Sequence, residues 1–304
     1  MDRSPRPSDK TRRASGERSS VGLGDAPCRG HTLKYGIAPS NAGLFGHPRN
    51  AVELARTAEE AGWDGYFIWD ALPVLPDPPP AYDPWVTLSA IATVTELIRI
   101  GTCIAVVPRY RPQLLARTLA TLDVLSNGRM IFGVGLGDGP SSFDAFGEDG
   151  AALARAQKLD EALEIITRLW SGEEVNHRGD HFVVEGFSLT ATPAQRPRIP
   201  IWVGGDSRGA LRRAARWDGW IGPSENPLAA SLDDAVRIIG RLSENGAGTE
   251  PFDVAWAGMA PSNDSDRVVP YGEAGATWWI EMLGGSREDV LARVASGPPR
   301  PDVS

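Results

Sequence analysis

The chain has little of several features that would assign a protein to a class at once. Its two cysteines, Cys28 and Cys103, cannot make a disulfide framework or a cysteine-rich metal site, which favours a reduced, cytoplasmic setting. No apolar run approaches the roughly 20 residues that span a bilayer, and the polar, basic N-terminus is unlike a secretory signal. We therefore expect no membrane segment.

Side chains that carry chemistry by themselves are also scarce. The four histidines and the carboxylates form no cluster with the spacing of a metal site, so we expect no metal. No lysine ends a predicted strand where it could form a Schiff base, and no Ser-His-Asp constellation can be assembled. This inventory favours a protein in which a bound cofactor does the reaction.

Charge is distributed unevenly along the chain. Residues 1–30 hold seven Lys and Arg against four Asp and Glu, whereas the remaining residues hold 24 against 35. An acidic body without a basic stripe argues against nucleic acid as a partner. We expect residues 1–30 to be a disordered basic tail, and residues 31–300 to form one domain.

Strand-like and helix-like segments alternate through that domain. The predicted strands, each a short and mostly apolar run, cover residues 33–38, 66–69, 98–107, 130–137, 199–203, 219–221, 252–259 and 276–282. Helical patterns lie between them, the longest over 151–170, while 138–150 is a predicted loop. Residues 175–189 indicate a hairpin excursion after the fourth helix, and 261–275 predict a stunted helix or an irregular loop.

Eight strands alternating with helices predict an α/β fold of the (β/α)₈ TIM-barrel type. The structural alternative is a doubly wound open sheet. That fold favours a GxGxxG fingerprint after the first strand, and this chain has none there.

In such a barrel the functional site lies at the carboxyl ends of the strands. The candidate residues there are Trp69, Asp70, Cys103, Ile104, Gly135, Gly137, Gly204, Gly205, Asp206 and Ser207. Gly204 and Gly205 allow close backbone approach, and a helix begins directly after Ser207, which is an arrangement that suits a phosphate. The same turn is also what any parallel α/β protein needs between a strand and a helix.

Several candidate side chains have two interpretations. Asp70 could orient a substrate and move protons, or it could only cap a loop. Trp69 and Trp202 could line a pocket or belong to the core. Arg109 and Arg111 could bind an anion or be solvated loop residues.

We interpret Cys103 as a small buried apolar residue rather than a reactive thiol.

Four stretches carry a resemblance to a known family, the bacterial luciferase-like flavin-dependent oxidoreductases. They are AEEAGWDGYFIWD (58–70), the long segment from DPWVTLSAIATV to MIFGVGLG (83–137), LDEALEIITRLWSGEEVNHRGDHF (159–182) and PRIPIWVGGDSRGALRRAARWDGW (197–220). Each is weak alone, but their order and spacing are specific.

The resemblance implies a barrel that binds FMN or the deazaflavin coenzyme F420 at the strand ends. By that resemblance Gly204, Gly205, Asp206 and Ser207 would hold the phosphate, and Gly135 and Gly137 would admit the ring. A cis peptide would fall at Cys103–Ile104 and form a bulge behind the ring. Many relatives have Asp-His or Glu-His after the second strand, whereas this chain has Asp70-Ala71.

Three functions follow from the resemblance. The leading one is a monooxygenase, in which reduced FMN from a partner flavin reductase reacts with oxygen and a small organic substrate is oxidised. The second uses coenzyme F420 for hydride transfer. The third is a non-catalytic flavin-binding or scaffold barrel, suggested by Ala71. Family members often pair, so a homodimer is a further expectation.

Overall fold

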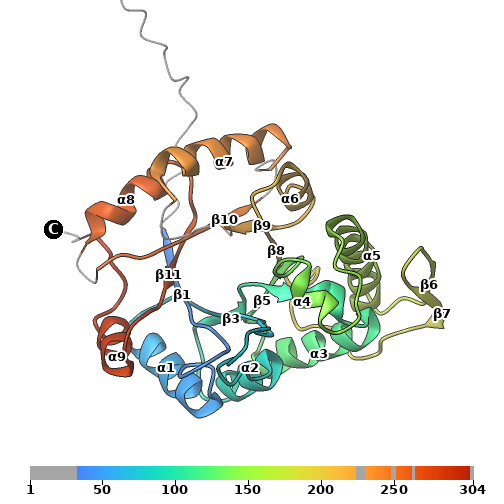
Figure 1. Cartoon of the computed structure of the whole chain (residues 1–304), viewed down its shortest axis with the longest axis horizontal. Coiled ribbons are helices and arrows are strands. Elements are labelled where there is room, and N and C mark those ends of the chain that lie inside the picture. The colour runs from blue at the N-terminus through green and yellow to red at the C-terminus, as the bar shows by residue number, and fades with distance from the viewer. Residues whose placement is uncertain (1–32, 224–229, 248–250, 262–263, 302–304) are drawn as a thin grey trace, which may run out of the picture. The chain divides into compact units, whose positions relative to one another are not determined.

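The computed structural model describes residues 33–223, 230–247, 251–261 and 264–301. Within these ranges parallel strands close into a barrel (Figure 1). In chain order they are β1 (Lys34–Ala38), β2 (Gly65–Ile68), β3 (Arg99–Thr102) with β4 (Ala105–Val106), β5 (Met130–Gly135), β8 (Ile201–Gly204), β9 (Gly219–Gly222), β10 (Asp253–Gly258) and β11 (Trp278–Met282). β1 pairs with β2 on one side and β11 on the other, and β3 pairs with β5, so the sheet closes. The predicted (β/α)₈ barrel is confirmed.

Helices in the connections surround the barrel. They are α1 (Pro48–Glu60), α2 (Pro84–Ala92), α3 (Pro112–Leu125), α4 (Ser141–Asp144), α5 (Ala152–Trp170), α6 (Arg208–Ala214), α7 (Leu232–Glu244), α8 (Ser265–Glu273) and α9 (Arg287–Ala295), with a 3₁₀ turn at Val107–Arg109. None of the helices in the described ranges is long and apolar enough to cross a bilayer. The predicted disordered tail, residues 1–30, lies outside the described residues.

Local sequence explains where these helices begin. α1, α2 and α3 each start with a proline, whose fixed φ suits the first helical position and whose missing N–H is not needed there. Asp83 caps α2 by accepting a hydrogen bond from the Val86 N–H at 2.9 Å. Ser231 and Ser286 begin α7 and α9 with capping boxes.

The apolar core has two layers, one between the sheet and the helices and one inside the barrel. In the outer layer α1 buries the four apolar residues that its periodicity predicts, including Leu54 and Ala58. In the inner layer Trp202 is fully buried, with its ring centroid 5.3 Å from those of Phe67 and Trp278. Of the two interpretations that the sequence leaves open for Trp202, pocket wall or core, the structure therefore supports the core.

One strand and one loop differ from the sequence prediction. The third predicted strand, 98–107, is interrupted between β3 and β4, because the chain leaves the ladder at Cys103 and Ile104. The predicted loop 138–150 contains the short helix α4. The stunted helix predicted within residues 261–275 is present as the short helix α8, which has Pro270 in its interior.

The predicted excursion after the fourth helix of the barrel is confirmed as an antiparallel hairpin, β6 (Val175–Arg178) and β7 (Val183–Phe187). Glu161 of α5 holds it by accepting hydrogen bonds from His177 Nε2, at 2.9 Å, and from the backbone N–H groups of His181 and Phe182. Figure 1 shows the hairpin beside α5, outside the ring of barrel strands. It lies outside the barrel sheet and does not line the candidate site described below.

Candidate active site

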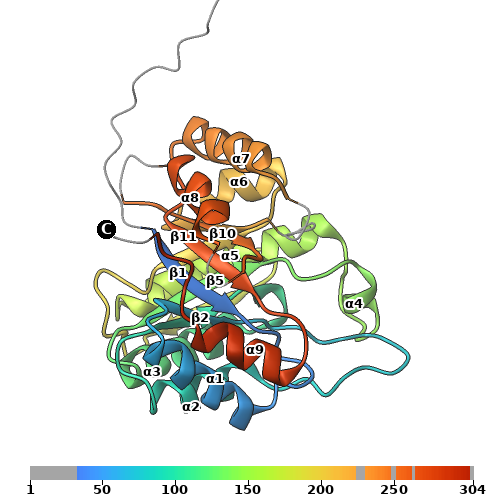
Figure 2. The ribbon, with the colours of Figure 1, turned by 90° about the vertical axis from the view of Figure 1, so that its left-hand side faces the viewer.

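A cavity of about 450 Å³ opens at the carboxyl ends of the barrel strands. Figure 2 shows these strands from the side, with α4 beyond their arrowheads. The cavity is lined by Trp69, Asp70, Ala71, Cys103, Ile104, Val106, Gly135, Leu136, Gly137, Asp138, Arg155, Gly204, Gly205, Asp206, Ser207, Ala210, Ile221, Gly222, Pro223, Ala257 and Met282. All ten residues that the sequence predicts for the site are therefore brought together, although their roles stay predictions.

Glycines shape one wall of the cavity around Ile104. A Cβ atom on Gly135 would lie 2.5 Å from Cδ1 of Ile104, and one on Gly204 would lie 2.9 Å from its Cγ2. The peptide bond Cys103–Ile104 is cis, as predicted. The Ile104 side chain thus occupies the space that larger residues on β5 and β8 would need.

The Cys103 thiol is a poor nucleophile in this position. Burial raises its pKa to about 12, because the apolar surroundings disfavour the thiolate. This agrees with the interpretation of Cys103 as a small apolar residue.

The turn from Gly204 to Ser207 presents backbone to the cavity. Gly205 has φ +109°, a conformation that favours glycine, and its carbonyl accepts a hydrogen bond from Trp220 Nε1 at 2.9 Å. The Ser207 hydroxyl caps α6 by accepting from the Ala210 N–H, at 3.1 Å. Glycines that keep side chains away from a lining turn suit a flat ring with a phosphate, so the residues present fit a flavin-type cofactor.

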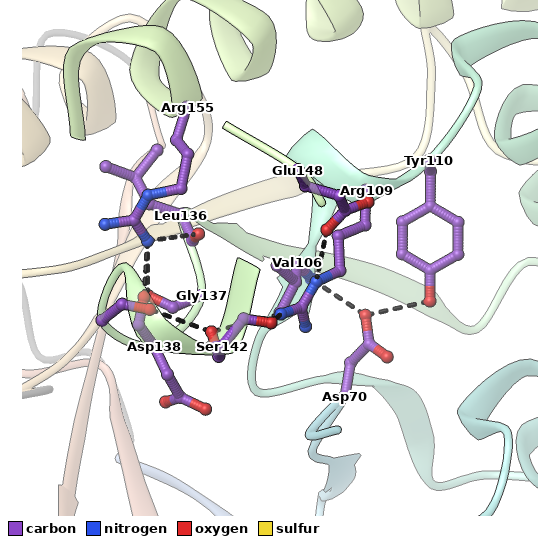
Figure 3. Close-up of polar contacts among 11 residues, drawn as sticks. Asp70, Val106, Arg109, Tyr110, Leu136, Gly137, Asp138, Ser142, Glu148 and Arg155 are labelled. Atoms are coloured by element: carbon purple, nitrogen blue, oxygen red, sulfur yellow. Dashed lines mark hydrogen bonds and ion pairs between the residues drawn. The ribbon is translucent and has the colours of Figure 1, made fainter. Parts of the chain in front are cut away.

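Asp70 follows β2 and lines the cavity. Figure 3 shows the hydrogen bonds that fix its carboxyl group. Its Oδ2 accepts two hydrogen bonds, from the Val106 N–H at 2.9 Å and from the Tyr110 hydroxyl at 3.0 Å. Burial raises the pKa of this carboxyl above its ordinary value, and these two donors and Arg109 only partly oppose the rise. A carboxyl with a raised pKa can give and take a proton nearer neutral pH.

Two arginines fix the segment that contains α4. Arg109 donates to the Ser142 carbonyl at 2.7 Å, pairs with Glu148 at 3.3 Å, and stacks 4.2 Å from the centroid of the Phe143 ring. Arg155 also contacts that ring, with 4.9 Å from its guanidinium carbon to the centroid. The sequence suggests that Arg109 either binds an anion or is solvated, but its guanidinium is instead engaged within the protein. Arg111 is exposed.

Arg155 is a charged lining residue that sequence reasoning missed. Its Nη1 donates to the carbonyls of Leu136, Gly137 and Asp138, the three residues that follow β5 (Figure 3). The side chain is only 6% exposed. It lies on α5, whose apolar periodicity explains burial of leucines but gives no signal for a buried arginine.

Asn41 was also missed, although it sets the position of Ala71. Its Oδ1 accepts from the Ala71 N–H at 2.9 Å, and its Nδ2 donates to the carbonyls of Ala71 and Tyr82, each at 3.0 Å. Asn41 is 2% exposed. It therefore joins the loop after β1 to the loop after β2.

Glu281, a second carboxylate at a strand end, does not face the cavity. It accepts hydrogen bonds from Trp279 Nε1 at 2.9 Å and from the Ala260 N–H at 2.9 Å, and pairs with Arg293 at 3.2 Å. Met282 next to it does line the cavity, since successive strand residues point to opposite faces. Glu281 therefore stabilises the contact between β11 and α9.

Comparison with known proteins agrees with the barrel fold. The chain belongs to the luciferase-like monooxygenase family, whose model matches residues 29–270. This is a family of oxidoreductases, which supports an enzymatic role.

One curated relative is the F420-dependent glucose-6-phosphate dehydrogenase of Microbacterium testaceum. It is 33% identical over 225 residues, which are 70% of this chain and 65% of the relative, so the match spans just under two thirds of the relative's length.

Two solved structures share the fold. An F420-dependent secondary alcohol dehydrogenase in complex with an F420-acetone adduct has a TM-score of 0.74 at 19% identity, covering 88% of this chain and 98% of that one. Monooxygenase RslO1 from Streptomyces bottropensis has a TM-score of 0.69 at 20% identity, covering 86% and 96%. An F420-dependent enzyme and a monooxygenase therefore both have this fold.

Proposed function

We propose that this protein is a coenzyme F420-dependent oxidoreductase that acts on a small organic substrate. The observation that carries the proposal is the glycine-walled cavity at the strand ends, in a chain 33% identical to an enzyme named for its dependence on F420. Of the alternatives drawn from the sequence, this one takes precedence over the reduced-FMN monooxygenase.

The residues around the cavity suggest how the coenzyme would be held. The Gly204–Ser207 turn would bind its phosphate, and Ile104, Gly135 and Gly137 would form a wall for its ring. Arg208 and Arg212 are exposed on α6, directly after the turn, and supply positive charge for the anionic tail that distinguishes F420 from FMN. When bound, the coenzyme supplies two-electron redox chemistry.

The protein's own residues would position the substrate and exchange a proton with it. Asp70 is the carboxylate for that task, because Val106 and Tyr110 both bind its Oδ2 and so leave Oδ1 for the substrate oxygen. Ala71 stands where many relatives have a histidine, so no imidazole follows Asp70 in the chain. Asp70 would therefore exchange the proton without that partner.

Titration of the purified protein with F420, FMN and reduced FMN tests the proposal. We expect F420 to bind at least about tenfold more tightly than either flavin, a difference of about 1.4 kcal/mol. The double variant Arg208→Ala, Arg212→Ala should weaken F420 binding and leave FMN binding unchanged. Arg216→Ala, at an exposed arginine beyond α6, is the control.

Other results would point to the other functions. Tighter binding of reduced FMN, with oxygen consumption, would favour the monooxygenase, which the fold shared with RslO1 supports. Binding of none of the three would favour a scaffold barrel and overturn the proposal.

A further inference from the structure

The cavity has a second wall, across the barrel from the phosphate turn. In the order of paired strands, β8 is the fifth barrel strand from β1, so its turn and the ends of β1, β2 and β11 lie on opposite sides of the mouth. The lining residues on this far wall are Trp69, Asp70, Ala71 and Met282. A substrate that shares the cavity with a cofactor held at β8 would contact them.

The charged residues around the cavity disfavour the binding of an anion at that wall. Among the described residues that line the cavity, the charged ones are Asp70, Asp138, Asp206 and Arg155. Arg155 lies on α5, and its Nη1 donates to the carbonyls of the three residues that follow β5. β5 pairs with β8, so these contacts lie on the side of the mouth opposite β1 and β11. Asp70 is thus the charged group that a substrate would meet there.

The nearby loops do not alter this balance. Arg109 is paired with Glu148 and bonded to Ser142. The loop from Ala71 to Tyr82 contains one charged residue, Asp77, and is otherwise apolar or proline, apart from Tyr82 itself.

We propose that the substrate bound on this wall is an uncharged, mainly apolar alcohol or carbonyl compound, without a phosphate or a carboxylate. An anionic group buried there would lose its hydration without gaining a cationic partner, and it would be repelled by Asp70. The substrate class therefore differs from the sugar phosphate in the name of the Microbacterium relative. This inference rests on the proposed function only for the position of the cofactor.

A ligand pair that differs in charge alone tests the inference. Methyl 4-oxocyclohexanecarboxylate and the free 4-oxocyclohexanecarboxylate share the ring and the ketone. Their dissociation constants are measured by isothermal titration and by ligand-detected NMR, with and without F420, and glucose-6-phosphate is added as a third ligand. We expect the ester to bind at least tenfold more tightly than the carboxylate, and glucose-6-phosphate to bind no better than the carboxylate. Equal or tighter binding of either anion would overturn the inference.

Charge placed on the wall should reverse the preference. Ala71→Lys should lower the dissociation constant of the carboxylate about tenfold and leave that of the ester little changed. Ala81→Lys adds the same charge to the same loop, at an exposed residue that does not line the cavity, and should change neither. Met282→Lys places the charge from β11 and tests the wall independently if Ala71→Lys folds poorly. If both cavity variants fold and leave the ratio unchanged, the inference is wrong.

The same samples separate this inference from the proposed function. A protein that binds the ester selectively but does not bind F420 would contradict the proposed function and support the substrate class. A protein that binds F420 and prefers the carboxylate would do the opposite.

Discussion

The two ends of the barrel use charged residues in opposite ways. At the amino ends of the strands, Arg129 is 8% exposed and donates five hydrogen bonds, from all three of its guanidinium nitrogens, to Ser126, Thr95, Ile98 and Ala92. Glu59 likewise accepts from the N–H groups of residues 96, 97 and 98. These groups have their partners within the protein.

At the carboxyl ends Glu281 and Arg109 also have partners within the protein, but the carboxylates Asp70 and Asp138, which line the cavity, are less engaged. Both hydrogen bonds to Asp70 fall on one of its two oxygens, and Asp138 is exposed at the mouth. The difference indicates that the amino end maintains the fold while the carboxyl end keeps polar atoms available for ligands, as barrels of this kind generally do.

The largest effect is expected at the amino end. Arg129→Met removes five donors and leaves buried acceptors without partners, which should lower the free energy of unfolding by about 3–5 kcal/mol. Urea denaturation measures this loss. Coenzyme affinity of the protein that remains folded should be unchanged, and a loss below about 1 kcal/mol would contradict the division between the two ends.

Asp70→Asn should show the opposite pattern at the carboxyl end. Because the carboxyl is the proposed proton-exchanging group, turnover should fall about 10²- to 10³-fold while coenzyme binding is retained. Steady-state kinetics with separate determination of kcat and KM measures the fall. Retention of full turnover would remove Asp70 from the reaction.

The same variant should change how stability depends on pH. The pKa of Asp70 is raised in the folded protein, so between the unfolded and folded values the folded state holds one more proton than the unfolded state. The free energy of unfolding of the natural protein therefore falls as pH rises through that window, and the stabilisation is fully present only below it. Asp70→Asn lacks this contribution, so the variant should gain stability relative to the natural protein as pH rises. Urea denaturation between about pH 4 and pH 8 tests the sign.

Gly135→Val should reduce ligand binding without unfolding the barrel. The added side chain displaces Ile104, whose Cδ1 lies 2.5 Å from the position of the new Cβ, toward the cavity. We expect coenzyme affinity to fall about 30- to 100-fold, or about 2–3 kcal/mol. Gly139→Val is the control, because a Cβ there meets no atom within 4 Å. Equal affinities for the two variants would show that Ile104 does not limit the cavity.

The smallest effect is expected from Tyr110→Phe. The variant loses one donor to the Asp70 carboxylate but keeps the ring that packs edge-on against Trp85, so the pKa of Asp70 should rise further. The alkaline shift is read by carbon-13 NMR of the Asp70 carboxyl, with at most a few-fold change in turnover. Tyr82→Phe is the control, and an identical shift in both variants would exclude a specific role for the Tyr110 hydroxyl.

Much of the fold and the composition of the mouth could be predicted from the sequence, because buried strands read as short apolar runs and their ends are marked by Gly, Asp and Pro. The direction of individual side chains was harder to predict. Trp278 and Ile280 point into the barrel while Trp279 and Glu281 point toward the helices, yet a strand that is buried on both faces shows no polar alternation to reveal this.

Long-range polar contacts could not be predicted at all. Arg109 and Arg155 meet at the Phe143 ring from different helical segments, and only the folded chain brings them together. Likewise, nothing in the spacing of Asn41 and Ala71 predicts that one side chain would bind both backbone groups of the other residue.

The contact of Asn41 with Ala71 and Tyr82 has a consequence for engineering. Further hydrogen bonds, from the Tyr82 N–H to the Asn41 carbonyl and from the Gly43 N–H to the Pro80 carbonyl, bind the same two loops to each other. A transplant of residues 71–82 from a relative with another specificity would lose its support unless residues 40–46 were transferred with it. The two loops therefore form a single cassette for exchange.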